Sequence, residues 1–248
     1  MKKGFFYMLL VPFLAFSMNS CTPEDNSGDN NGGNGGGSNN NYHNGHEFVD
    51  LGLPSGTLWA TCNVGAGTPE DYGRYFAYGE IDYKNNYTWE VYKYGWKDGS
   101  ATNNYKIYKY NMNPLYGDVD NLTVLELSDD AASVKWGGNW RIPTREECSE
   151  LLSYCLYEPA TQNDVKGLRL TGSNGNSIFL PSAGFYKEQQ IMDKDIQGYY
   201  RTSSLWCNPN SSDGSRCAYA LQFHSEHAQM YSPGSRPCGY PIRPVFTK

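Results

Sequence analysis

The chain has 248 residues and a formal net charge of −6, from 26 acidic and 20 basic side chains. An acidic chain is a poor ligand for nucleic acid or for anionic lipid, so the composition argues against both as partners. Aromatic residues make up 15% of the chain, and 21 tyrosines with 27 glycines predict short strands and long loops rather than a helical bundle.

Residues 1–20 have the pattern of a secretory signal peptide. Lys2 and Lys3 precede an apolar run over residues 5–16, which is too short for a comfortable membrane span. The segment resembles a bacterial lipoprotein signal with Ser20 before a lipidated Cys21, and the acidic residues after it resemble the surface-export signal of Bacteroidetes lipoproteins. The resemblance implies an outer-membrane lipoprotein, displayed outside the cell and held to the membrane only by the Cys21 lipid. In the alternative, cleavage is ordinary and Cys21 is a stray thiol.

Residues 21–45 predict the lipidated cysteine and a flexible tether. They are nearly all Asn, Gly, Ser and Asp, which bury too little apolar surface to offset the entropy of ordering the chain. A Gly-rich coil of this length spans about 25–30 Å, enough to lift a domain above lipid headgroups. His43 and His46, at the end of the tether, are interpreted as solvated. Residues 46–248 then suit a single domain with its own core.

The domain is expected to open with short strands over residues 48–53, 57–64 and 74–80. Residues 81–118 follow, rich in Tyr, Trp, Lys and Asn, and predict a long loop with short strand pieces. Flat aromatic faces can stack on sugar rings, so the candidate ligand-binding residues are Trp89, Tyr92, Trp96 and Tyr108. In the alternative, these aromatics pin the loop to the domain as a satellite core.

The clearest helix signal lies at residues 144–156. Thr144 and Glu147 form a capping box and Pro143 blocks an earlier turn, so a helix is expected to begin at Thr144. Its apolar stripe consists of Cys148, Leu151, Leu152, Cys155 and Leu156. A shorter helix is expected over residues 128–134, with Ser128 as its N-cap.

The last third of the chain predicts strands and a candidate disulfide. Residues 167–171 and 177–181 should form a hairpin, because Asn174-Gly175 supplies a tight turn at low cost. Closing strands are expected over residues 199–206, 218–223 and 240–246. Cys207 and Cys217 flank the loop between the first two of these strands and would form a disulfide if the strands pair.

Five segments between residues 47 and 247 resemble one known family. They read EFVDLGLPSGTLWATCNVGAGTPEDYGRYFAYGE, DDAASVKWGGNWRIPTREECSELL, GNSIFLPSAGFY, GYYRTSSLW and PIRPVF. Together they resemble the Fibrobacter succinogenes major paralogous domain of Bacteroidetes surface lipoproteins. The resemblance implies an α+β, C-type-lectin-like fold of the kind seen in formylglycine-generating enzymes, with short antiparallel strands, one main amphipathic helix, long loops and a last strand beside the first.

The structural residues of these motifs are Trp140, Arg141, Pro143, Trp206 and Arg243. Arg141 and Arg243 are interpreted as buried or half-buried arginines that tie loops together by several hydrogen bonds. The family's biochemical activity is mostly unassigned, and a fold of this type serves sugar binding, protein binding and oxidation.

Patterns of known catalytic or metal sites are missing from the sequence. His224 and His227 are three positions apart and would face opposite sides of a strand. The sequence has no nucleophile elbow, phosphate loop, EF-hand loop or lectin sugar-selecting tripeptide. The surroundings of Cys217 and Cys238 do not match the active-site motif of formylglycine-generating enzymes. No catalytic residue, metal or cofactor is therefore assigned.

These observations predict a non-catalytic, surface-displayed lipoprotein whose domain binds a glycan or a surface protein, as an adhesin or a fimbria-associated part. One alternative is an enzyme of the formylglycine-generating type or an unrecognised hydrolase. Another is a structural module of an envelope assembly. An exposed cluster of Trp89, Tyr92 and Trp96 would favour binding, and a concave pocket with converging polar groups would favour an enzyme.

Overall fold

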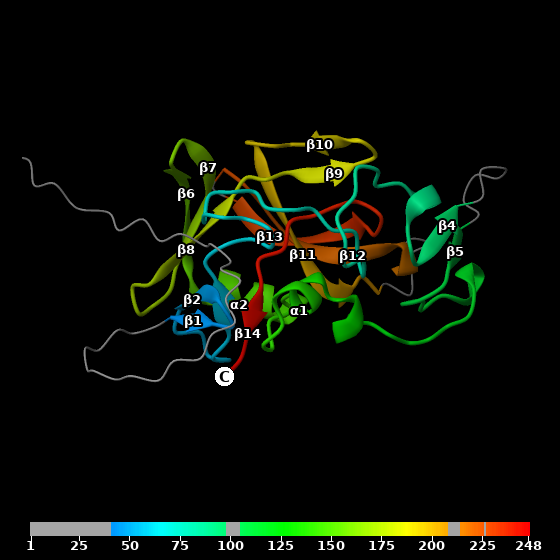
Figure 1. The fold of residues 1–248 in the computed structure, drawn as a ribbon, viewed down its shortest axis with the longest axis horizontal. Helices are drawn as coiled ribbons and strands as arrows, with labels where there is room; N and C mark the ends of the chain where they lie inside the picture. The colour runs from blue at the N-terminus through cyan, green and yellow to red at the C-terminus, as the bar shows by residue number, and fades with distance from the viewer. Residues whose placement is uncertain (1–40, 98–104, 208–213, 226) are drawn as a thin grey trace, which may run out of the picture.

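The computed structural model describes residues 41–97, 105–207, 214–225 and 227–248 (Figure 1). The expected signal peptide, Cys21 and nearly all of the tether lie outside these residues. None of the helices within the described ranges combines the length and the apolar character needed to cross a membrane.

The two ends of the domain meet in one antiparallel sheet. Its strands, in the order β1-β2-β3-β14, are β1 (Tyr42–His43), β2 (His46–Asp50), β3 (Leu58–Ala60) and β14 (Val245–Phe246). Val245 lies opposite Trp59, so the closing strand pairs with the second of the expected N-terminal strands, and β2 flanks that strand on its other side. The first described strand, β1, lies slightly before the expected start of the domain at residue 46.

A second sheet, at one end of the long axis of the molecule, contains the predicted hairpin (Figure 1). Its strands, in the order β6-β7-β8, are β6 (Leu156–Gln162), β7 (Val165–Thr171) and β8 (Ser177–Pro181). Leu168 lies opposite Leu180, and the loop between the two strands places Gly175 at a φ of 85°, the positive φ expected of its glycine. The pairing of β6 with β7 was not anticipated from the sequence.

The central sheet consists of three long strands. They are β11 (Gln197–Leu205), β12 (Cys217–His224) and β13 (His227–Ser235), in that order. The first two strands match strands expected from the sequence, but β13 was not expected. The remaining described strands form two short hairpins. In one, β4 (Gly95–Lys97) pairs with β5 (Tyr105–Ile107), and in the other, β9 (Phe185–Lys187) pairs with β10 (Gln190–Met192).

Two α-helices lie below the central sheet in Figure 1, α1 (Ala131–Trp136) and α2 (Arg145–Tyr154). The capping box of α2 is formed, since Glu147 N donates to Thr144 Oγ1 at 3.2 Å and Thr144 N donates to Glu147 Oε2 at 2.8 Å. The predicted N-cap of α1 is wrong by two residues. Asp130, not Ser128, accepts the Ser133 amide at 2.9 Å, because residues 127–129 form a separate 3₁₀ turn.

The apolar stripe of α2 ends earlier than predicted. Cys148 and Leu151 are fully buried, and Cys155 is the C-cap. Leu156 belongs to β6 and is exposed, because the backbone turns extended at Cys155 and the helical period stops there.

Two large apolar clusters make up most of the core. One lies between α2, the β6–β8 sheet and the central sheet, and includes Leu151, Leu168, Leu180 and Leu221. The other consists mostly of residues from the segment before α1 and is rich in tyrosine; it includes Phe76, Tyr78, Tyr92 and Tyr110. The result is a mixed fold, rich in antiparallel strands, with two helices in its described part.

Candidate functional site

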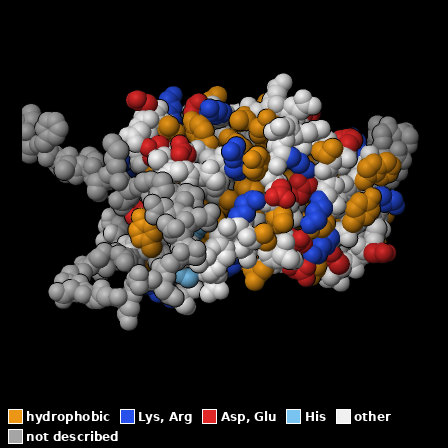
Figure 2. All heavy atoms as spheres, in the orientation of Figure 1, with side chains coloured by type: hydrophobic (Ala, Val, Ile, Leu, Met, Phe, Trp, Pro, Cys, Tyr) orange, Lys and Arg blue, Asp and Glu red, His pale blue; other side chains and the backbone are white. Residues whose placement is uncertain are grey.

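The β4–β5 hairpin contains the exposed part of the aromatic segment. Trp96 lies opposite Lys106, and Tyr108 N donates to Tyr94 O at 2.9 Å, so Trp96, Lys106 and Tyr108 share one face of the hairpin. Trp96 is 41% exposed and Tyr108 is 66% exposed. Figure 2 shows hydrophobic and basic side chains gathered at this end of the molecule. We call Trp96, Lys106 and Tyr108 the hairpin face.

Tyr92 is a core residue and does not belong to the hairpin face. It is only 5% exposed, its hydroxyl donates to Tyr78 O at 2.7 Å, and it accepts from Arg236 Nε at 2.9 Å. Burial raises the pKa of Tyr92 to about 12. The expectation that Tyr92 binds a ligand is therefore corrected, because its ring and hydroxyl are both engaged inside the domain.

Trp89 lies behind the hairpin instead of beside Trp96. Its ring meets those of Tyr92 and Tyr105 edge to face, with centroids 5.5 and 5.0 Å away. A Cβ at Gly95 would come within 2.7 Å of the Trp89 ring, so that ring covers the face formed by Gly95 and Tyr105. Trp96 points to the opposite face because side chains alternate along a strand. The predicted cluster of Trp89, Tyr92 and Trp96 is thus divided between two faces and the core.

Asp129 accepts hydrogen bonds from three side chains at the base of the hairpin. It accepts from Lys109 Nζ at 2.6 Å and from Tyr110 Oη at 2.8 Å, and the hydroxyl of Tyr94 also donates to it. Burial on its own raises the pKa of Asp129, but the bonds from Lys109, Tyr94 and Tyr110 lower it to about 2. Asp129 therefore stays ionised and fixes three residues of the aromatic segment.

Arg236 fixes the same segment from the side of the central sheet. Its fully buried guanidinium donates to Lys109 O at 2.8 Å, Tyr110 O at 3.1 Å and Ser215 O at 2.9 Å. The role of Arg236 was not predicted, since an isolated arginine after a strand carries no recognisable sequence pattern. Asp129 and Arg236 together hydrogen-bond the residues at the base of the hairpin. These bonds hold the hairpin face in a defined orientation.

The motif residues around α2 are packed and hydrogen-bonded. Trp140 is fully buried and donates from Nε1 to His43 O at 2.9 Å. Arg141 binds Glu147 through two parallel bonds, at 2.6 and 2.5 Å. Pro143 O accepts the Ser203 amide at 2.8 Å, and this bond fastens the start of the helix to β11.

Arg243 has the buried, multiply bonded position predicted for a structural arginine. Its guanidinium donates to Asn63 Oδ1 at 2.8 Å and to the carbonyls of four further residues, which are Ala60, Thr61, Pro69 and Phe179. It joins the end of the chain to the segment after β3 and to β8.

Cys207 and Cys217 do not form the disulfide considered from the sequence, since both are free thiols. Leu205 lies opposite Ala218, and Trp206 N donates to Cys217 O at 3.1 Å. Cys217 is therefore opposite Trp206, and Cys207 points to the other face because adjacent side chains alternate. The strands pair as expected, but their register separates the two sulfurs.

Both histidine pairs lie at hairpin turns. His43 lies opposite His46 and stacks on Phe246 with ring centroids 4.1 Å apart, while His46 stacks on Trp136 at 3.7 Å. The interpretation of these histidines as solvated tether residues is therefore corrected.

The second pair, His224 and His227, lies at the exposed turn between β12 and β13, with ring centroids 5.7 Å apart. The two rings share one side because the turn brings them opposite each other. Across the described ranges, no group of three or more His, Cys, Asp or Glu side chains is arranged to hold a metal.

The chain matches no family model, no curated protein and no solved structure. The family resemblance and the expected C-type-lectin-like fold therefore rest on the sequence motifs alone.

Proposed function

We propose that this chain is a non-catalytic, surface-displayed lipoprotein whose C-type-lectin-like domain binds a glycan through the hairpin face. The observation that carries the proposal is the exposure of Trp96 and Tyr108 on one face of β4–β5, on either side of Lys106. The lipoprotein-like signal, the tether and the family resemblance support the proposed location and fold. Surface display at the end of a tether is the arrangement that an adhesin or a fimbria-associated part requires.

The chemistry of the hairpin face suits a sugar. An indole and a phenol ring offer flat apolar surfaces for the C–H face of a pyranose, and their polar atoms bond hydroxyl groups. The Lys106 ammonium adds three donors at the same place. Because Asp129 and Arg236 already hold the base of the hairpin, binding orders few additional groups.

The thiols that the formylglycine-type alternative would use are shielded. Cys217 and Cys238 are both buried free thiols. Burial raises the pKa of Cys217 to about 11 and also raises the pKa of Cys238, so both remain protonated at neutral pH. The burial and protonation of these thiols favour the hypothesis of a non-catalytic protein over that of an enzyme of the formylglycine-generating type.

The test is glycan-array binding of the mature chain, compared with Trp96→Ala and Tyr108→Ala. Each substitution should weaken binding to the selected glycan about tenfold or more, as truncation of a central aromatic contact does. Tyr154→Ala is the matched control, since Tyr154 is 58% exposed on α2, away from the hairpin. Binding that survives both hairpin substitutions would contradict the proposal. A blank array, with and without calcium, would move the assignment to a protein ligand at the same face.

A further inference from the structure

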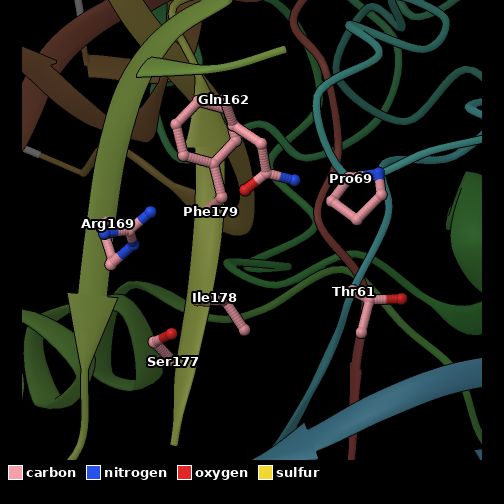
Figure 3. A pocket seen from close by; sticks show the side chains of 7 residues that line it. All are labelled: Thr61, Pro69, Gln162, Arg169, Ser177, Ile178 and Phe179. Atoms are coloured by element: carbon pink, nitrogen blue, oxygen red, sulfur yellow. The ribbon is translucent and has the colours of Figure 1, made fainter. Parts of the chain in front are cut away.

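We propose that a second binding site, independent of the hairpin face, lies against the β6–β8 sheet and takes a carboxylate-bearing sugar of the hexuronate class through Arg169. The site is a pocket of about 390 Å³. Six of its lining residues carry the argument: Gln162 of β6, Arg169 of β7, Ser177 and Phe179 of β8, and Thr61 and Pro69 from the segment after β3 (Figure 3).

Strand register places the sheet residues of the pocket on one face. Arg169 lies opposite Phe179 on β8 and opposite Glu158 on β6. Gln162 is four positions from Glu158 along β6, so it shares that face. In Figure 3, Arg169 lies on one side of the hollow, and Thr61 and Pro69 lie on the other. The pocket therefore spans two segments that are far apart in the sequence.

Arg169 is a half-buried cation without a partner in the described part of the chain. No hydrogen bond, ion pair or aromatic contact engages its guanidinium there, and this holds even for Glu158 directly across the ladder. The other arginine of this region, Arg243, has five acceptors around it. An unpaired guanidinium facing a pocket offers donors in a fork that matches a carboxylate.

The walls of this pocket are fixed before any ligand arrives. Arg243 donates to the carbonyls of Thr61, Pro69 and Phe179, so a single buried side chain joins three lining residues. The Gln162 amide donates to Glu70 Oε2 at 3.0 Å, which holds that side chain as well. A site with fixed walls loses little conformational freedom on binding.

The lining combines the groups that an acidic sugar needs. A planar carboxylate can accept two parallel bonds from Arg169. The side chains of Gln162 and Ser177 can bond ring hydroxyls, while Pro69 supplies apolar surface for the C–H face of the sugar. The volume of about 390 Å³ lies at the small end of the range of about 300–1,000 Å³ for small-molecule sites, which fits one or two sugar units.

This pocket and the hairpin face lie at opposite ends of the long axis in Figure 1, so the two sites can be tested separately. The probes are D-galacturonate and its neutral methyl ester, titrated into the mature chain and followed by ligand-observed saturation-transfer NMR. The acid should bind at least about tenfold more tightly than the ester, because only the acid can pair with Arg169. Added salt should weaken its binding.

Arg169→Gln should lower galacturonate affinity about tenfold or more, and Arg169→Lys should give an intermediate loss, because an ammonium lacks the planar fork. Lys166→Gln is the matched control. Lys166 lies on the same strand as Arg169 but on the opposite face of the sheet, and its substitution by Gln removes the same positive charge. Glu158→Gln should leave binding unchanged or strengthen it. The thermal midpoint of Arg169→Gln should stay within about 2 °C of wild type, because the side chain has no bonds to lose within the described structure.

Equal galacturonate binding by wild type and Arg169→Gln would overturn the proposal, as would equal affinity for the methyl ester. Inorganic sulfate that displaces the sugar at equal concentration would also overturn it, because the site would then select charge alone. Trp96→Ala should bind galacturonate like wild type. A loss there would place the uronate at the hairpin face instead of at Arg169.

Discussion

The two ends of the molecule differ in how completely their side chains are engaged. At the hairpin end, the hydroxyl of Tyr92 donates to a carbonyl, and those of Tyr94 and Tyr110 donate to Asp129. At the β6–β8 end, the described structure leaves Arg169 facing a pocket with no partner. The sequence of the hairpin end has the features of a binding site, because it is rich in aromatic residues. The β6–β8 end lacks such a pattern, but it contains the unpaired guanidinium of Arg169.

The aromatic residues of one segment can serve its own stability or bind a ligand, and burial separates the two groups here. Most tyrosines between residues 81 and 118 stabilise the segment itself, and Asp129 and Arg236 are the hubs of their hydrogen bonds. A side chain is free to bind a partner only if these hydrogen bonds leave it exposed or unpaired. The hairpin face and Arg169 are two candidates that meet this criterion in the described part of the chain.

The largest expected effect is at Arg243, which fastens the pocket end. Arg243→Met removes a buried donor set and leaves Asn63 and nearby carbonyls without partners, so the free energy of unfolding should fall by about 4 kcal/mol. Urea unfolding of the two proteins measures the difference. Arg145→Met is the control: Arg145 is exposed over the Tyr219 ring, and its loss should cost less than about 1 kcal/mol. Equal losses would refute the role given to Arg243.

The next effect is at Asp129, the hub of the hairpin end. Asp129→Asn removes the carboxylate that pairs with Lys109 and accepts two tyrosine hydroxyls, so about 3 kcal/mol of stability should be lost at pH 7. Asp118→Asn, on an exposed carboxylate of the same segment, should change stability by less than about 0.5 kcal/mol.

The loss at Asp129 should depend on pH in a defined direction. The pKa of Asp129 is about 2 in the folded protein, below the value of about 3.9 for a free aspartate. The ionised group therefore stabilises the fold fully above about pH 4, and this contribution disappears as the pH falls from about 4 to about 2. The stability difference between wild type and Asp129→Asn should shrink over that window. A difference that stays constant from pH 7 to pH 2 would refute the ion-pair account.

A smaller effect is expected at Tyr92. Tyr92→Phe keeps the ring in the core but removes the bond to Tyr78 O and leaves Arg236 Nε without an acceptor, so stability should fall by about 1–2 kcal/mol. Tyr108→Phe, on the exposed side of the hairpin, should be neutral within about 0.5 kcal/mol. Thermal unfolding of the two variants in parallel checks this contrast.

Local signals in the sequence predicted local structure well. The Thr144–Glu147 capping box and the Asn174-Gly175 turn are both formed, since each depends on residues close together in the chain. The pairing of β6 and the existence of β13 were missed, because strand pairing depends on packing that no short pattern records.

The sites were predicted only in part. Trp96 and Tyr108 are exposed as a binding role requires, but Tyr92 is in the core and Trp89 is on the other face. Composition identified the aromatic segment and could not say which rings the fold would bury. Arg169 carried no sequence signal at all, because its interest comes from the missing partner and the pocket.

The most direct test measures glycan binding and unfolding together on Trp96→Ala and Tyr92→Phe. We expect opposite results: Trp96→Ala loses binding and keeps its stability within about 0.5 kcal/mol, whereas Tyr92→Phe loses about 1–2 kcal/mol of stability and keeps its binding. If Tyr92→Phe abolished binding while Trp96→Ala bound normally, the division between an aromatic core and an exposed hairpin face would be wrong.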